Sequence, residues 1–170
     1  MIVQGQTTIF KQNLLSGLEN FAAGTAYTYK IALYDANANL DNSTLAYTTT
    51  NEVSGTGYTA GGLTLTPSVG SDSTNNVAYV TFSNVTWSPA GFTCRGALIY
   101  NSTTNAAVAV LNFGSDKTAT TSFTIQFPSA TSTSASGTIA GGITVSFTAT
   151  SIWFAQLGSG TNYWTEGVPP

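Results

Sequence analysis

Carboxyl groups offer the main acid–base chemistry in this sequence, because histidine is absent and only one cysteine is present. Paired carboxylates on either side of a sugar bond are the catalytic groups of most glycoside hydrolases. The chain has seven Asp and Glu residues. The candidates for such a pair are Asp35, Asp41, Glu52, Asp72 and Asp116. All of these stand in loop-like sequence, where carboxylates are normally solvated. We therefore expect no catalytic residues and predict that the protein is not an enzyme.

The lack of histidine also removes the commonest general base and the commonest transition-metal ligand. Neither a Ser-His-Asp nor a Cys-His arrangement can form. The single cysteine, Cys94, can make neither an internal disulfide nor a structural zinc site of the usual kind. We predict that Cys94 is a small core residue, and we expect neither a metal nor a cofactor.

One segment begins like a calcium-binding loop, with Asp35, Asn37 and Asn39 at alternate positions. The sixth position of such a loop requires glycine and the twelfth requires glutamate. Here those positions hold Leu40 and Ala46. The pattern therefore predicts a turn and no calcium site.

Residues 48–66 contain four glycines and one large aromatic residue, Tyr58. The spacing of Gly55, Gly57 and Gly61 misses the dinucleotide-binding fingerprint, and no helix is predicted after it. Glycine reaches positive φ at little steric cost, so these residues favour a tight turn. We expect this loop to hold Tyr58 packed between two strands.

Composition indicates one domain with an unusual surface. The 170 residues are 42% hydrophobic, which is enough for a core, but only 6% are charged. An ordinary soluble domain has about 25% charged residues. Thr, Ser, Asn and Gly replace the charges, so copies of the chain repel one another weakly. Such surfaces are common in proteins that pack into assemblies or that work outside cells.

The charges argue against nucleic acid as a partner. The net charge is −3, and phosphate contacts require clustered Lys and Arg. The four basic residues are scattered: Lys11, Lys30, Arg95 and Lys117. No apolar run approaches the ~20 residues that span a bilayer. The first residues lack the features of a secretory signal, so we expect synthesis in the cytoplasm without a signal peptide and no membrane partner.

Residues 8–21 form the only helical-looking segment. Ile9, Phe10, Leu14, Leu18 and Phe21 recur at spacings of three and four, which gives one apolar face. Gly17 weakens the pattern, so we expect a short helix or one broken near its end. This helix either caps the core or anchors the protein to a partner.

From Tyr27 onward the pattern becomes that of strands. Alternating residues at 27–34 are followed by short β-prone segments at 45–50, 63–66, 77–82, 97–101, 106–113 and 122–127. Short strands without intervening helices favour an all-β antiparallel fold. We predict an Ig-like or jelly-roll-like β-sandwich over residues 1–127, with Phe82, Trp87 and Phe92 as large fillers of its core or rim.

Residues 128–170 are predicted to be an extension of this domain. Residues 128–136 are small and polar, and residues 137–157 favour another pair of strands. The last residues form an extended arm that carries Tyr163 and Trp164. The arm is too short for its own core, so it must pack on its own body or on a neighbouring subunit.

Four sequence blocks resemble a family of small structural proteins of tailed bacteriophages: YKIALY at 29–34, NEVSGTGYTAGG at 51–62, CRGALIYN at 94–101 and AVAVLNFGSDK at 107–117. The resemblance implies a virion component on the capsid exterior, either a capsid decoration (cement) protein or a tail- or fibre-associated part. It implies as partners the major capsid protein and further copies of this chain, with a trimer favoured. It brings no catalytic or cofactor residues. Relatives tend to end shortly after the strand that closes at Phe127, so the extension departs from the family pattern.

The residues expected to make assembly contacts are Phe10, Leu14, Tyr58, Tyr163 and Trp164. The alternative from a different class is a carbohydrate-binding module on the virion surface. In that case exposed aromatic rings would stack on sugar faces, and the candidates are Trp87, Trp153, Tyr163 and Trp164.

Overall fold

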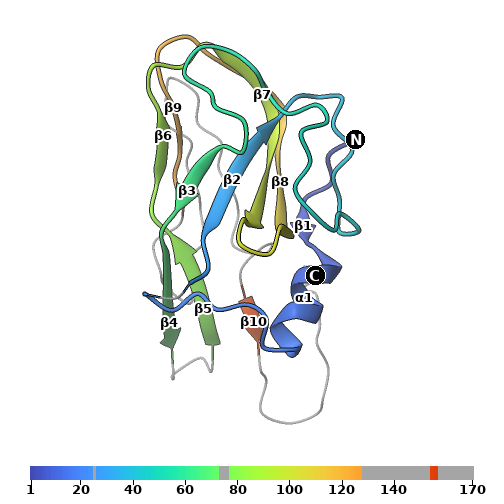
Figure 1. The fold of residues 1–170 in the computed structure, drawn as a ribbon. Coiled ribbons are helices and arrows are strands. Elements are labelled where there is room, and N and C mark those ends of the chain that lie inside the picture. Colours follow the sequence, from blue (N-terminus) through green and yellow to red (C-terminus); the bar gives the residue numbers. More distant parts are fainter. Residues whose placement is uncertain (25, 73–76, 128–153, 157–170) are drawn as a thin grey trace.

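The computed structural model describes residues 1–24, 26–72, 77–127 and 154–156, and it describes the side chains of these residues except at 72–79 and 154–156. The described chain is mostly antiparallel β-sheet with one short helix (Figure 1). This confirms the predicted β-rich class and the short N-terminal helix.

Three sheets make up the β structure of the described residues. A five-stranded sheet has the order β1 (Gly5–Gln6), β8 (Ala106–Ala119), β7 (Phe92–Asn101), β2 (Tyr29–Tyr34) and β3 (Leu63–Leu65). A three-stranded sheet has the order β10 (Phe154–Gln156), β5 (Val77–Phe82) and β4 (Pro67–Asp72). A two-stranded sheet pairs β6 (Val85–Trp87) with β9 (Phe123–Ile125). Neighbouring strands are antiparallel in every sheet.

Strand β2 is buried on both faces of the five-stranded sheet. Ile31 and Leu33 point into a large core cluster that also contains residues of β5, β6 and β9. Ala32 and Tyr34 point to the opposite face, where a smaller cluster includes Leu98. A strand covered on both sides reads as nearly continuous apolar sequence, which explains the YKIALY block.

Helix α1 (Thr8–Leu15) is shorter than the predicted apolar pattern. The Thr7 hydroxyl caps it by accepting a hydrogen bond from the Phe10 N–H at 3.2 Å, and it donates to the Ala107 carbonyl at 2.7 Å. These bonds fix the start of α1 on β8. The helix ends before Gly17, which has a φ of +70°, as its sequence favoured. Among the described residues, no helix is long and apolar enough to cross a membrane.

The predicted strands are largely confirmed, with one error, at 45–50, and three omissions among the described strands, β1, β4 and β6. Residues 45–50 are not a strand, because only Ala46 forms an isolated bridge, to Ala106. Strand β4 was not predicted, since its sequence PSVGSD is rich in turn-forming residues. Pairing with β5 over its whole length overrides that local preference. Strand propensity depends strongly on such context.

A short piece of the predicted extension joins the same body. Strand β10 pairs with β5, with Phe154 opposite Tyr79 and Gln156 opposite Val77. The predicted linker at 128–136 and the aromatic arm with Tyr163 and Trp164 lie outside the described residues.

Cys94 is fully buried on β7, which confirms its predicted core position. Burial, with a smaller contribution from the nearby Asp116 carboxylate, raises the pKa of the Cys94 thiol from 9.0 to about 12. Because the thiolate is the reactive species, we expect iodoacetamide to label the native protein at least ~100-fold more slowly than the urea-unfolded chain at the same mildly alkaline pH. Mass spectrometry of timed aliquots measures both rates. Equal rates would show that the core around β7 opens readily.

Candidate functional site

The glycine loop at 48–66 is organised around the carboxylate of Glu52. The Tyr58 hydroxyl and the Gly61 N–H both donate to Glu52 Oε1, each at 2.7 Å. The Tyr47 hydroxyl donates to the other oxygen, Oε2, at 2.6 Å. We call Glu52, Tyr47, Tyr58 and Gly61 the Glu52 cluster. Its hydrogen bonds connect Tyr47, Tyr58 and Gly61, which lie outside the strands and the helix, through one carboxylate.

Tyr58 is packed, as predicted from the loop sequence. Its ring centroid lies 6.2 Å from that of Trp87 and 5.7 Å from that of Phe92. Its hydroxyl also accepts a hydrogen bond from the Leu33 N–H at 2.8 Å. Tyr58 therefore fastens the loop to β2 and to the aromatic core.

Two glycines allow the loop to approach its neighbours closely. A Cβ atom at Gly62 would lie 1.8 Å from the Ile31 carbonyl oxygen, and one at Gly57 would lie 1.7 Å from the Pro89 carbonyl oxygen. Both glycines have positive φ, at +68° and +77°. The loop is therefore a packed structural element, in agreement with the tight turn that its glycines predicted.

A second hydrogen-bonded carboxylate, that of the buried Glu19, was not predicted. It is only 9% exposed and lies after α1. Its Oε2 atom accepts from the Tyr29 hydroxyl at 2.7 Å and from Asn101 Nδ2 at 3.0 Å, while its Oε1 atom accepts from Asn13 Nδ2 at 3.4 Å. Nothing in the local sequence signals these partners, because they come from α1, β2 and the end of β7.

The other candidate carboxylates occupy turns and exposed positions. Asp35 Oδ1 accepts from the Asn37 N–H at 2.7 Å, which confirms the predicted turn. Asp41 accepts from the hydroxyl and the N–H of Ser43, and these bonds lower the pKa of its carboxyl. Asp116 pairs with Arg95 at 2.7 Å. The side chain of Asp72 is outside the described part. Within that part, no group of three or more His, Cys, Asp or Glu residues could hold a metal ion.

The buried tyrosines have raised pKa values. Burial is the largest cause for Tyr29, Tyr34, Tyr47 and Tyr58. The carboxylate of Glu19 adds to the effect at Tyr29, and that of Glu52 adds to it at the other three. A phenolate next to a carboxylate would place two negative charges together in a poorly solvated site.

These shifts predict alkaline instability. The folded protein holds each phenol proton more tightly than the unfolded chain does, so the stabilisation is complete below the ordinary pKa of 10.0 and is lost as the pH rises above it. We expect the urea midpoint to fall steeply above about pH 10, with the tyrosinate absorbance of Tyr29, Tyr34, Tyr47 and Tyr58 appearing only as the protein unfolds. The variants Tyr29→Phe and Tyr58→Phe should each make this fall shallower. Tyrosinate absorbance that develops fully in the folded protein would contradict the prediction.

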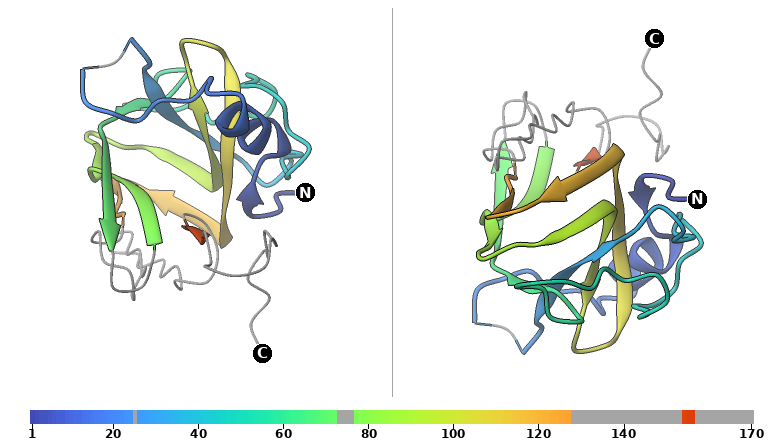
Figure 2. Two further views of the ribbon diagram at one scale, coloured as in Figure 1. Left: turned by 90° about the horizontal axis from the view of Figure 1, so that it is seen from below. Right: turned by 90° about the horizontal axis from the view of Figure 1, so that it is seen from above.

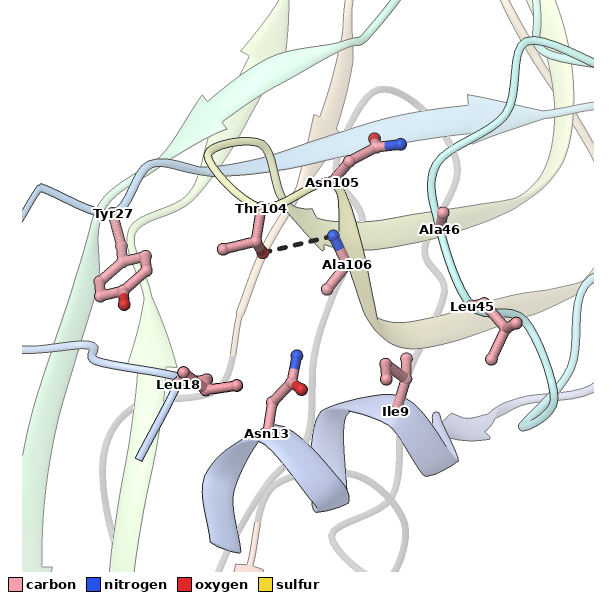
Figure 3. Close-up of a pocket in the computed structure, with 9 residues that line it drawn as sticks. All are labelled: Ile9, Asn13, Leu18, Tyr27, Leu45, Ala46, Thr104, Asn105 and Ala106. Carbon is pink, nitrogen blue, oxygen red and sulfur yellow. Dashed lines mark hydrogen bonds between the residues drawn. The ribbon is translucent and has the colours of Figure 1, made fainter. Parts of the chain in front are cut away.

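A groove lies between α1 and the turn that joins β7 to β8 (Figure 3). It has a volume of about 390 Å³ and is lined by Ile9, Asn13, Leu18, Tyr27, Leu45, Ala46, Thr104, Asn105 and Ala106. We call it the α1 groove. Figure 3 shows Ile9 and Asn13 projecting from α1 toward Thr104–Ala106, with Leu18 and Leu45 at its two ends. Its walls are mainly aliphatic, and its polar groups are amides and hydroxyls with no charge.

Exposed leucines lie in this groove and elsewhere on α1. Leu18 is 52% exposed and Leu45 is 66% exposed. In the last turn of α1, Leu14 and Leu15 are 43% and 77% exposed. Sequence reasoning named Leu14 but missed Leu15 and Leu45, because Leu15 falls off the predicted apolar face and Leu45 falls in a segment predicted as a strand.

The structure separates the predicted assembly contacts. Phe10 is a core residue, 3% exposed, packed edge-on against Phe21. Leu14 is on the surface and Tyr58 is half-buried in the Glu52 cluster. Tyr163 and Trp164 lie outside the described residues. Of these predicted contacts, only Leu14 lies on an exposed apolar surface in the described part of the chain.

The predicted sugar-stacking residues gain no support from the described part of the chain. Trp87 is 2% exposed and packs against Phe92 and Phe123, so it presents no face to a sugar. Trp153, Tyr163 and Trp164 lie outside the described residues.

No protein-family description, curated protein or solved structure matches this chain. The site is therefore described from its own geometry. The carboxylates of Glu19 and Glu52 hold parts of the fold together, and exposed leucines lie on α1 and in the groove beside it.

Proposed function

We propose that this chain is a structural protein of a bacteriophage virion, most specifically a capsid decoration protein that stabilises the shell through protein–protein contacts. Three features support the proposal: the resemblance of four sequence blocks to that family, the 6% content of charged residues, and the exposed leucines at α1. The proposed partners are the major capsid protein and further copies of the chain, on the capsid exterior.

The observation that carries this proposal is the exposure of Leu18 and Leu45 in the α1 groove, together with that of Leu15 on the surface of α1. Each large aliphatic side chain gains about 1.5–3 kcal/mol when it is fully removed from water. Gathered exposed apolar residues mark an interaction surface more often than scattered ones do. A cement protein works by burying such area against its neighbours.

We also propose that the sheets form a β-sandwich. The core cluster contains residues of the five-stranded sheet together with Phe82, Val85, Trp87, Phe123 and Ile125 of β5, β6 and β9. Sheets that share a core in this way support an antiparallel β-sandwich of Ig-like or jelly-roll-like type. The aromatic arm at the C-terminal end completes the proposed design.

Copy number distinguishes decoration from tail attachment. Quantitative mass spectrometry of purified particles should find this chain in numbers comparable to those of the major capsid protein, and cryo-EM should locate it on the shell. A tail or fibre component would be present in only a few copies per particle. Absence from purified particles would refute the virion assignment altogether.

A matched pair of variants tests the α1 surface. We expect Leu15→Asp to lower particle occupancy at least about tenfold, since burying an unpaired carboxylate at an interface costs more than the ~1.4 kcal/mol that a factor of ten requires. Thr120→Asp is the control. Thr120 is exposed and directly follows β8. Strand β8 ends at the other end of the molecule from α1, as Figure 1 shows. Equal occupancy of both variants would remove the α1 surface from the proposal.

A further inference from the structure

We propose that the α1 groove binds the C-terminal segment, residues 161–170, of a neighbouring copy of this chain. The inference rests on the proposed function, since it takes the α1 surface as a docking surface, and it names the occupant of that surface. Copies would then be joined by an arm from one subunit seated in the groove of the next.

The groove has the size and chemistry of a site for aromatic side chains. Its volume of about 390 Å³ lies within the ~300–1,000 Å³ typical of small binding pockets. Aliphatic walls from Ile9, Leu18 and Leu45 can pack against a flat ring. Asn13 and Thr104 bring side-chain oxygens to the same space, where an indole N–H or a phenol O–H needs a partner.

The C-terminal segment carries matching groups. Tyr163 and Trp164 are adjacent, and the chain ends in Val168, Pro169 and Pro170. A buried Tyr or Trp removes about 150–250 Å² of surface from water while using few rotatable bonds. Two prolines reduce the freedom that the segment loses on binding. The segment is also mostly uncharged, like the groove, so few charges would need a partner at the contact.

The position of β10 favours a neighbouring copy over the same copy. Eight residues, 157–164, lead from the end of β10 to Trp164, and at ~3.3–3.6 Å per residue they can extend about 26–29 Å. Both views in Figure 2 place β10 and α1 on different sides of β8. We therefore assign the segment to the groove of an adjacent copy, and the chain with both cysteines described below distinguishes this from docking in its own groove.

The resulting contact is head-to-tail, because the groove and the arm are different surfaces. Such contacts close into rings when the rotation between copies allows it. A ring of this kind is compatible with the trimer that the family resemblance favours. Each copy in the ring would contribute one arm contact to its neighbour.

Disulfide trapping between two chains of different length tests the docking. One chain carries Thr104→Cys at the rim of the groove, and the other carries Thr165→Cys next to Trp164. Both changes leave the leucines and aromatic residues intact. Cys94 is fully buried, so it contributes little background. Under mild oxidation we expect mixed disulfide dimers at a yield at least about tenfold above that of a Thr120→Cys and Thr165→Cys pair, because docking raises the effective concentration of the two thiols.

Further variants decide between the outcomes. Adding Leu18→Asp to the groove chain, or Trp164→Ala to the arm chain, should reduce the mixed dimer to the control yield while circular dichroism remains unchanged. The inference is overturned if the mixed dimer never exceeds the control. It is also overturned if a chain that carries both cysteines closes an intramolecular disulfide at high dilution, which would place the arm in its own groove. If trapping fails while Leu15→Asp still lowers particle occupancy, the proposed function stands and only the arm docking falls.

Discussion

Gly62→Ala is expected to destabilise the protein by about 3 kcal/mol or more, enough to prevent folding in a marginally stable chain. The added Cβ would lie 1.8 Å from the Ile31 carbonyl oxygen and 2.8 Å from the Ala32 Cα. Both atoms belong to the backbone of β2, the strand that is buried on both faces, so neither can move aside cheaply. Urea unfolding followed by circular dichroism gives the free energy directly.

Gly114→Ala is the matched control for this prediction. Gly114 also has a positive φ, +76°, but a Cβ atom there would meet nothing within 4 Å. Its substitution should cost only the ~1–2 kcal/mol of placing an L-residue in the left-handed region. The difference between the two variants measures the collision with β2 alone. Equal costs would show that the loop can move away from β2, contrary to its packing in this structure.

Glu52→Ala is expected to have the second large effect, a loss of about 3 kcal/mol or more. The substitution leaves the Tyr58 and Tyr47 hydroxyls and the Gly61 N–H without their shared acceptor. A hydrogen bond to a charged group contributes about 1.5–3 kcal/mol, and an unsatisfied partly buried donor adds to the loss. Glu52→Gln should cost less, about 1–2 kcal/mol, because the amide oxygen can still accept.

The control carboxylate is Asp116, which forms an exposed ion pair with Arg95. Its replacement by alanine should change stability by no more than about 1 kcal/mol, as is usual for solvated pairs. Hydrogen exchange of the 48–66 amides adds a local measure, since the Glu52 variants should lose protection there first. A Glu52→Ala variant as stable as Asp116→Ala would mean that aromatic packing alone holds the loop.

Several features of the fold could be predicted from the sequence because they depend on local chemistry. Alternating and continuous apolar residues predicted β2, β7 and β8, since burial on a sheet imposes that pattern. Gly17 marked the end of α1, and the glycines around Tyr58 marked a packed turn, because backbone conformation at positive φ selects glycine. The absence of histidine likewise limits the available chemistry, because no other side chain has an ordinary pKa between 5 and 8.

Other features were decided only by the tertiary structure. Glu19 is held in part by Asn101, which is 82 residues away in the sequence, so no local pattern distinguishes Glu19 from a solvated carboxylate. The partners of Glu52 lie within nine residues of it, but only the folded loop brings them to its carboxylate. Strand β4 exists because β5 pairs with it, and residues 45–50 fail to form a strand although their sequence favours one. The α1 groove arises where the helix, the 45–46 loop and the β7–β8 turn meet. Whether a leucine is exposed depends on which segments of the folded chain cover it, so the exposed leucines could not be identified from the sequence alone.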